Sequence, residues 1–182
     1  MPEYRRIFIP GGMYFFTVVT YNRTPFLTTP LARSVLRHAW KSVQTRQPFE
    51  TIAMCLLPDH LHSLWMLPEN YTNYSIRWRA IKGLFSRKFT TRGGFPGEIN
   101  HSRLKRGEKA AWQRRFWEHA IRSQEDYNRH FDYIHFNPVK HSLVKTVNDW
   151  PWSTFHKYRR LGHYPLDWGV NDFKEQDIDF GE

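Results

Sequence analysis

Two strand-like segments separated by three residues constrain the fold of this 182-residue chain more than any other feature. Residues 49–57, FETIAMCLL, and residues 61–67, LHSLWML, are apolar and rich in residue types that favour strands. The PDH sequence at 58–60 is too short for a crossover between parallel strands, so it predicts a tight antiparallel hairpin. An antiparallel sheet is therefore expected at the centre of the fold.

A further strand and a first helix precede this hairpin. Residues 13–22, MYFFTVVTYN, are aromatic and β-branched and follow two glycines, which predicts a strand. Residues 29–46 predict a helix, with Thr29 as N-cap and Pro30 in the first turn. The expected apolar stripe of this helix consists of Leu31, Val35, Leu36, Ala39 and Val43.

A second helix is predicted after the hairpin, over residues 74–89, YSIRWRAIKGLFSRKF. Its pattern predicts one apolar and one basic face. The residues expected to face inward are Ile76, Ala80, Ile81, Leu84 and Phe85, and those expected on the outer surface are Arg77, Arg79, Lys82, Arg87 and Lys88.

The second half of the chain predicts a loop and then a late helix. Residues 93–110 lack periodicity and contain four glycines, which indicates a mobile loop. Ser123 is the expected N-cap of a helix that Pro138 ends. The order of elements predicts an α+β fold, a split βαβ (ferredoxin- or RRM-like) antiparallel sheet with helices on one face. We expect one domain over residues 1–166 and an acidic tail over 167–182.

The charge is strongly basic and unevenly distributed. Lys and Arg number 27 against 17 Asp and Glu, a net charge of +10. Residues 167–182 alone carry −5, which leaves +15 on residues 1–166. Such a body attracts a polyanion, with nucleic acid the default candidate, although a soluble basic protein without this partner is the alternative. No apolar run is long enough to span a membrane, and the lone Cys55 fits a reducing compartment such as the cytoplasm.

Two histidines one residue apart interrupt the apolar hairpin. His60 and His62 share a face of the predicted strand, about 6–7 Å apart along it, whereas Leu61 points to the other face. Two imidazoles placed in this way can chelate a metal ion if another element supplies a third ligand. The alternative is a pair of ordinary surface histidines.

The late helix offers chemical partners for these histidines. Tyr133 and Asn137 are four residues apart and therefore share a helical face, so that they can supply a nucleophile and an oxygen ligand. Tyr127, six residues before Tyr133, faces another direction. Two alternatives remain open: Tyr133 is a core tyrosine, and Asn137, which precedes Pro138, is a helix C-cap.

These motifs resemble the REP-associated tyrosine transposases, which are HUH nucleases named for a His-hydrophobic-His motif. The resemblance covers about residues 4–168 and is most specific over 112–144. It is carried by HLH within LPDHLHSLWMLPE, and by YRRIFIPGGMYFFTV, RWRAIKGLFSRKF, WQRRFWEHAIRSQEDYNRHFDYIHFNPVKHSLV and DWPWSTFHKY. The chain departs from the family pattern in the loop at 93–110 and in the acidic tail.

The resemblance implies a metal-dependent endonuclease and strand transferase that acts on single-stranded DNA. Tyr133 would attack a phosphate and form a 5′-phosphotyrosine, His60 and His62 would hold Mg²⁺ or Mn²⁺, and Asn137 would complete the metal site. The implied substrate is a REP hairpin with a flanking guide tetranucleotide. The family's sheet, with the tyrosine on a late helix, agrees with the predicted order of elements, and the resemblance allows a monomer or a homodimer.

Basic residues near aromatic ones are candidates for the DNA path, since phosphates pair with Arg and Lys while bases stack on rings. The expected contacts are Arg77, Arg79, Lys82, Arg114 and Arg115, with Lys140 adding positive charge at Tyr133. The family resemblance implies that the N-terminal segment with Arg5 and Arg6 reads the guide bases. The acidic tail is a candidate competitor of DNA, and the alternative is a solvated, disordered chain end.

Two other functions suit parts of the pattern. A catalytically idle nucleic-acid-binding module would use the same charge and aromatic residues without forming a covalent bond. A metallohydrolase for a small phosphate ester would use the same histidines, but it has no need of a body with a net charge of +15.

Overall fold

A computed structural model describes residues 7–165, 167–169 and 180. Four strands form one antiparallel sheet in the order β2-β3-β1-β4. The strands are β1 (Met13–Val19), β2 (Glu50–Leu56), β3 (His60–Met66) and β4 (Trp117–Ala120). With one helix after β1 and another after β3, this order is the predicted split βαβ sheet, and the predicted hairpin is the β2–β3 pair.

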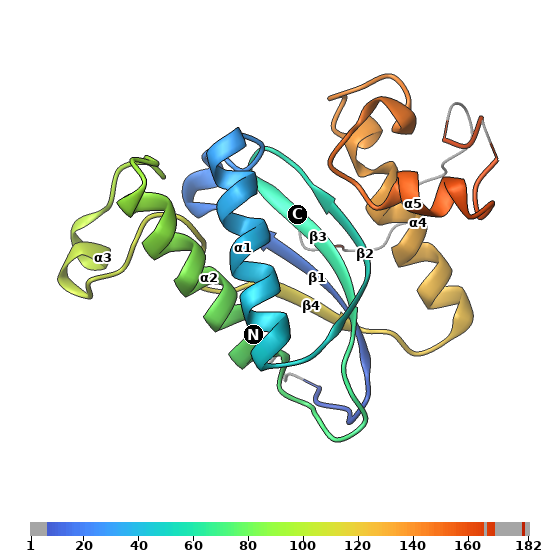
Figure 1. Cartoon of the computed structure of the whole chain (residues 1–182), viewed down its shortest axis with the longest axis horizontal. Helices are drawn as coiled ribbons and strands as arrows, with labels where there is room; N and C mark the ends of the chain where they lie inside the picture. Colours follow the sequence, from blue (N-terminus) through green and yellow to red (C-terminus); the bar gives the residue numbers. More distant parts are fainter. Residues whose placement is uncertain (1–6, 166, 170–179, 181–182) are drawn as a thin grey trace, which may run out of the picture.

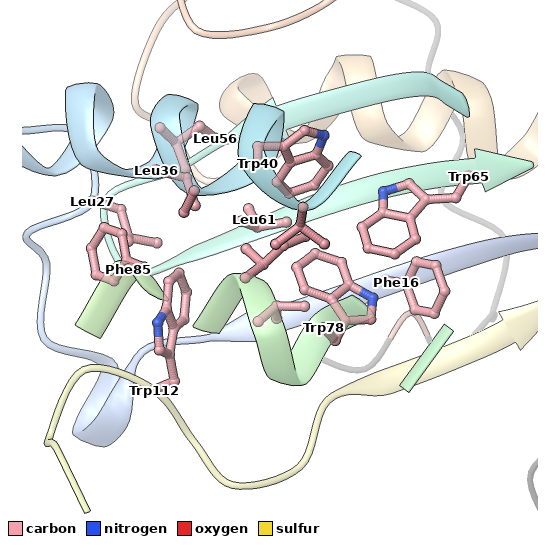
Figure 2. Packing of buried hydrophobic residues seen from close by; sticks show 14 of the residues in the cluster. Phe16, Leu27, Leu36, Trp40, Leu56, Leu61, Trp65, Trp78, Phe85 and Trp112 are labelled. Atoms are coloured by element: carbon pink, nitrogen blue, oxygen red, sulfur yellow. The ribbon is translucent and has the colours of Figure 1, made fainter. Parts of the chain in front are cut away.

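Helices α1 (Pro30–Arg46) and α2 (Tyr74–Thr91) cover one face of the sheet (Figure 1). The Thr29 side chain caps α1 by accepting a hydrogen bond from the backbone N–H of Ala32, as expected. Large aromatic side chains fill the space between these helices and the sheet (Figure 2). Trp65 of β3 and Trp78 of α2 stack with ring centroids 4.4 Å apart. Each such buried ring contributes roughly 2–3 kcal/mol of hydrophobic free energy.

The register of α2 differs from the prediction. Ile76 is 45% exposed and Arg77 only 3%, so the expected inward and outward positions are wrong at these two residues. Tyr74 and Trp78 occupy the inner face because they bury more surface than Ile76 does. The Arg77 guanidinium donates to the carbonyls of Pro48, at 2.9 and 3.1 Å, and of Asn73, at 2.8 Å. Arg77 is therefore a buried structural residue.

The segment 93–110, predicted as a loop without helices, contains the short helix α3 (His101–Lys105). Asn100 caps it by accepting from the backbone N–H of Arg103 at 3.0 Å. Arg103 is buried, and its guanidinium lies 3.9 Å from the ring centroid of Tyr21. The remaining short elements are η1 (Tyr21–Arg23), η2 (Val147–Asp149) and α5 (Phe155–Arg160).

Helix α4 (Gln124–Lys140) covers the opposite face of the sheet, so the prediction that helices pack on one face only is wrong. The side chain of Ser123 caps it as expected, accepting from Asp126. Pro138 does not end the helix, because the backbone N–H of His141 still bonds to the carbonyl of Asn137 at 3.0 Å. Asn137 consequently lies inside the helix and is not its C-cap.

Strands β1 and β3 are covered on both faces, and successive side chains alternate between two cores. Phe16, Leu61 and Trp65 face α1 and α2, whereas Phe15 and Leu64 face α4. By this alternation His60 and His62 face α4, the helix that carries Tyr133. Within the part of the chain that the structure describes, no helix combines the length and apolar character needed to cross a membrane.

Candidate active site

His60 and His62 lie side by side under α4. Their side chains are 1% and 0% exposed, and their ring centroids are 4.9 Å apart, nearly perpendicular at 80°. Burying two imidazoles costs free energy unless the nitrogens of each ring have hydrogen-bond or metal partners. The partners of these nitrogens therefore indicate what the pair can bind.

Asp59 orients His60. Its carboxylate lies 2.6 Å from His60 Nδ1 and also accepts a hydrogen bond from Arg23 at 3.0 Å. Partial burial alone would raise the pKa of Asp59, but the hydrogen bond from His60 and the guanidinium of Arg23 lower it to about 2. The ionised carboxylate holds the proton on Nδ1, which leaves the lone pair on Nε2 of His60.

Thr17 of β1 orients His62 in the same sense. The Thr17 hydroxyl donates its one proton to the carbonyl of Phe180 at 2.5 Å, so it must accept from His62 Nδ1, which is 2.9 Å away. His62 therefore also carries its lone pair on Nε2. Neutral imidazoles whose Nδ1–H groups are held by an oxygen are typical of metal ligands in proteins.

Helix α4 brings Tyr133 and Asn137 to this pair, and His141, the C-cap of the helix, follows one turn after Asn137. The Tyr133 ring lies 5.3 Å from that of His62, and the His141 ring lies 5.0 Å from that of His60. Asn137 lies between them on the same helical face and is fully buried. Two imidazole nitrogens and a carboxamide oxygen form a donor set that suits a divalent cation and leaves coordination positions for a phosphate.

Two further groups contact the Tyr133 phenol. Lys140 donates to the Tyr133 hydroxyl at 3.0 Å, which stabilises negative charge on that oxygen. Phe180 stacks on the ring with centroids 3.5 Å apart and an angle of 7°. Tyr133 is fully buried under this cover, whereas Tyr127 stacks on Phe131 away from the two histidines.

Only some of the residues predicted to contact DNA lie at the surface. Arg79, Arg114 and Arg115 are exposed, as expected. Arg114 pairs with Glu108 at 3.0 Å, and Lys82 donates to the carbonyls of Gln113 and Arg114. The remaining candidates are buried Arg77, Lys140 beside the Tyr133 hydroxyl, and Arg5 and Arg6, which lie outside the described residues.

Four residues of the site were not identified from the sequence: Thr17, Asp59, His141 and Phe180. Asp59 and His141 carried a local signal, since one directly precedes His60 and the other lies one helical turn after Asn137. Thr17 and Phe180 carried none, because they meet across 163 residues of chain.

Replacing Asp59 with Asn is expected to weaken Mn²⁺ binding by about 10- to 100-fold, since outer partners of a ligand histidine fix its tautomer. Isothermal titration with Mn²⁺ measures this. The ionised carboxylate of Asp59 also stabilises the fold. Because its pKa is lowered to about 2, this contribution to folding stability is fully present above pH 4 and is lost only as the pH falls through about 2. Equal Mn²⁺ affinity in D59N and wild type at pH 7 would contradict the orienting role.

Comparisons with known proteins show the family of this chain. The family model described as IS200-like transposase matches residues 10–137. A REP-associated tyrosine transposase of Escherichia coli K12 is 47% identical over 175 residues, covering 95% of each chain. A Haemophilus influenzae protein that carries the same name provisionally is 46% identical over 171 residues, covering 94% of this chain and 95% of the relative.

A solved structure gives the same result in three dimensions. It is a REP-associated tyrosine transposase bound to a REP hairpin, with a TM-score of 0.76 and 45% sequence identity. The match covers 98% of this chain and 100% of that one. The chain belongs to the IS200-like transposases and, within them, to the REP-associated tyrosine transposases.

Proposed function

We propose that this transposase binds single-stranded REP hairpins and cleaves one phosphodiester through Tyr133, with Mg²⁺ or Mn²⁺ held by His60, His62 and Asn137. The observation that carries the proposal is the meeting of β3 and α4, where the Tyr133 ring lies 5.3 Å from that of His62. The oriented Nδ1–H groups of both histidines support the metal assignment. We infer that it acts beside DNA in the cytoplasm of a bacterium.

The proposed step is a transesterification. The Tyr133 oxygen loses its proton and forms a bond to phosphorus, while the bond from phosphorus to the 3′ oxygen of the upstream strand breaks. That oxygen takes up a proton and leaves as a 3′-OH, and the downstream strand stays on Tyr133 through its 5′ phosphate. Because the tyrosine ester retains the energy of the broken bond, a 3′-OH can later attack it and rejoin strands without ATP.

Each group of the chain has a part in this step. His60, His62 and Asn137 supply the ligands, and a bound divalent cation contributes Lewis-acid stabilisation of the phosphate. Lys140 stabilises the phenolate that attacks, since an ordinary tyrosine with a pKa near 10 is mostly neutral at pH 7. Two imidazole ligands favour Mn²⁺ over Mg²⁺, which prefers oxygen.

Replacing Lys140 with Gln is expected to slow formation of the covalent adduct by about 100-fold, because one preorganised charge at the reacting oxygen is lost. Hairpin affinity should change little if Lys140 acts on Tyr133. If Lys140 instead contacts a phosphate, K140Q would weaken binding and reduce its salt dependence by about one unit. Single-turnover cleavage and hairpin titrations at several salt concentrations distinguish the two roles.

The tail contributes Phe180 as a cover on the nucleophile, and we propose that DNA must displace it. Replacing Phe180 with Ala is expected to increase the initial rate of adduct formation about 10-fold, because the face of Tyr133 becomes accessible. A matched variant that neutralises Asp172, Glu175, Asp177 and Asp179 but keeps Phe180 tests whether charge alone competes with DNA. Unchanged rates and hairpin affinity in both variants would contradict any competition by the tail.

The function is tested with the full-length protein and a single-stranded REP hairpin labelled at one end. With Mn²⁺ present, we expect a 3′-labelled strand to migrate with the protein on a denaturing gel and a 5′-labelled strand to be released as a shorter product. Chelation of the metal should abolish both products. Tight hairpin binding with no adduct under any metal condition would instead support the idle nucleic-acid-binding module.

A further inference from the structure

A second group of metal-ligand side chains lies outside the site described above. His119 of β4 and Asp126 and His130 of α4 offer three ligand atoms that all lie within 4.8 Å of one another. His119 Nε2 is 2.8 Å from one Asp126 carboxylate oxygen, and His130 Nδ1 is 3.0 Å from the other. A carboxylate held between two imidazoles is a donor set that Zn²⁺ and similar transition metals bind.

This group is separate from the pair at His60 and His62. Strand β1 lies between β3, which carries His60 and His62, and β4, which carries His119. Phe15 of β1 contacts both groups, with its ring centroid 5.4 Å from that of His62 and 4.8 Å from that of His130. The second group is also more exposed to solvent. The side chains of His119 and Asp126 are 29% and 20% exposed, whereas His60 and His62 are buried. One ion cannot serve both groups.

Two of the three side chains, Asp126 and His130, carry the net charge that a metal ligand requires. Burial, the largest influence, lowers the pKa of His130, so its imidazole is neutral at pH 7. Burial tends to raise the pKa of Asp126, but the hydrogen bonds from His119 and from the backbone of Arg122 lower it, so its carboxylate is ionised. No described residue forms a hydrogen bond with Nε2 of buried His130, so no hydrogen bond at this nitrogen restrains rotation of the ring.

We propose that His119, Asp126 and His130 form a second metal site, for a transition metal ion of the Zn²⁺ class. Ligand atoms around such an ion lie about 3–3.5 Å apart, since each bond is about 2.0–2.2 Å. The two nitrogen–oxygen contacts are already close to this spacing, and small rotations of the rings bring the third pair within range. On binding of such an ion, the proton on each ligating nitrogen would move to the other nitrogen of the same ring, and water from the exposed side would complete the coordination.

The position of the site gives the metal a structural consequence. It joins β4 to the first two turns of α4, and His130 precedes Tyr133 by three residues on that helix. A metal ion there would fix α4 against the sheet and with it the position of the nucleophile. The same residues without metal form a hydrogen-bonded network, which is the alternative that the experiment must exclude.

The test uses the full chain with His60 and His62 both replaced by Gln, so that the site of the proposed function is disabled. Equilibrium dialysis with Co²⁺ should then give one ion per chain, with the visible absorption of a nitrogen- and oxygen-ligated Co²⁺. Adding H119Q should remove this ion, whereas adding H101Q, at an exposed histidine of α3, should not. Circular dichroism verifies that each variant is folded.

Zn²⁺ provides an independent readout in the same background. It should raise the melting temperature of the His60 and His62 variant and of its H101Q derivative, but not that of its H119Q derivative. Co²⁺ binding that survives H119Q in a folded protein, or the absence of any ion in the starting variant, would overturn the second site. Neither result bears on cleavage by Tyr133, which is measured in the wild-type protein.

Discussion

Replacing Tyr133 with Phe is expected to abolish the covalent DNA adduct, with a loss of at least about 10³-fold, while hairpin affinity stays within about twofold of wild type. The substitution removes the attacking oxygen and leaves the ring, which keeps its contacts with His62 and Phe180. The lost hydrogen bond from Lys140 costs about 1 kcal/mol of folding stability, so the variant should remain folded.

The matched control for this variant is Tyr127→Phe on the same helix. Tyr127 packs on Phe131 outside the site, so Y127F should form the adduct at the wild-type rate. Denaturing gels with a 3′-labelled hairpin measure the adduct, and titration with the same hairpin measures binding. An adduct that persists in Y133F, or disappears in Y127F instead, would assign the nucleophile elsewhere.

Replacing both His60 and His62 with Gln is expected to reduce cleavage by about 10³-fold at saturating hairpin. Metal stabilisation of a phosphate in the transition state is worth several kcal/mol, and about 4 kcal/mol corresponds to 10³ in rate. Gln is preferred to Ala because both rings are fully buried and truncation would leave a cavity between Phe15 and Tyr133.

The metal dependence of this double variant separates a ligand role from a structural role. Raising the Mn²⁺ concentration should restore cleavage in D59N, where only the orientation of His60 is lost, but not in the double variant. Wild-type cleavage by the double variant at ordinary Mn²⁺ concentrations would exclude the two histidines as metal ligands. Loss of hairpin affinity in parallel with cleavage would instead indicate a disturbed fold.

The parts of the fold that followed from the sequence depend on local periodicity. The two-residue period of a strand placed His60 and His62 on one face and Leu61 on the other, and the structure has this arrangement. The helical period placed Tyr133 and Asn137 on a common face, and both lie on the side of α4 that meets β3. The three-residue turn was sufficient to identify the β2–β3 pair.

The features that the sequence did not predict depend on contacts that a local sequence pattern does not reveal. The sequence predicted Arg77 at the surface because the helical pattern gives no sign of its partner, the carbonyl of Pro48, which lies 29 residues away in the chain. Pro138 looked like a helix end, but the helix continues to Lys140 and carries the ammonium that contacts Tyr133. The predicted loop at 93–110 contains the five-residue helix α3, which Asn100 caps and which is too short for a periodic pattern to reveal.

Locating the attached DNA on the protein tests most directly whether Tyr133 is the nucleophile. After reaction with a REP hairpin and Mn²⁺, trypsin separates residues 123–129, which contain Tyr127, from residues 130–140, which contain Tyr133. We expect mass spectrometry to find a 5′-phosphorylated nucleotide on Tyr133 in peptide 130–140, and to find none when the metal is chelated. A nucleotide on peptide 123–129, or an adduct on Tyr133 that forms equally well without metal, would contradict this expectation.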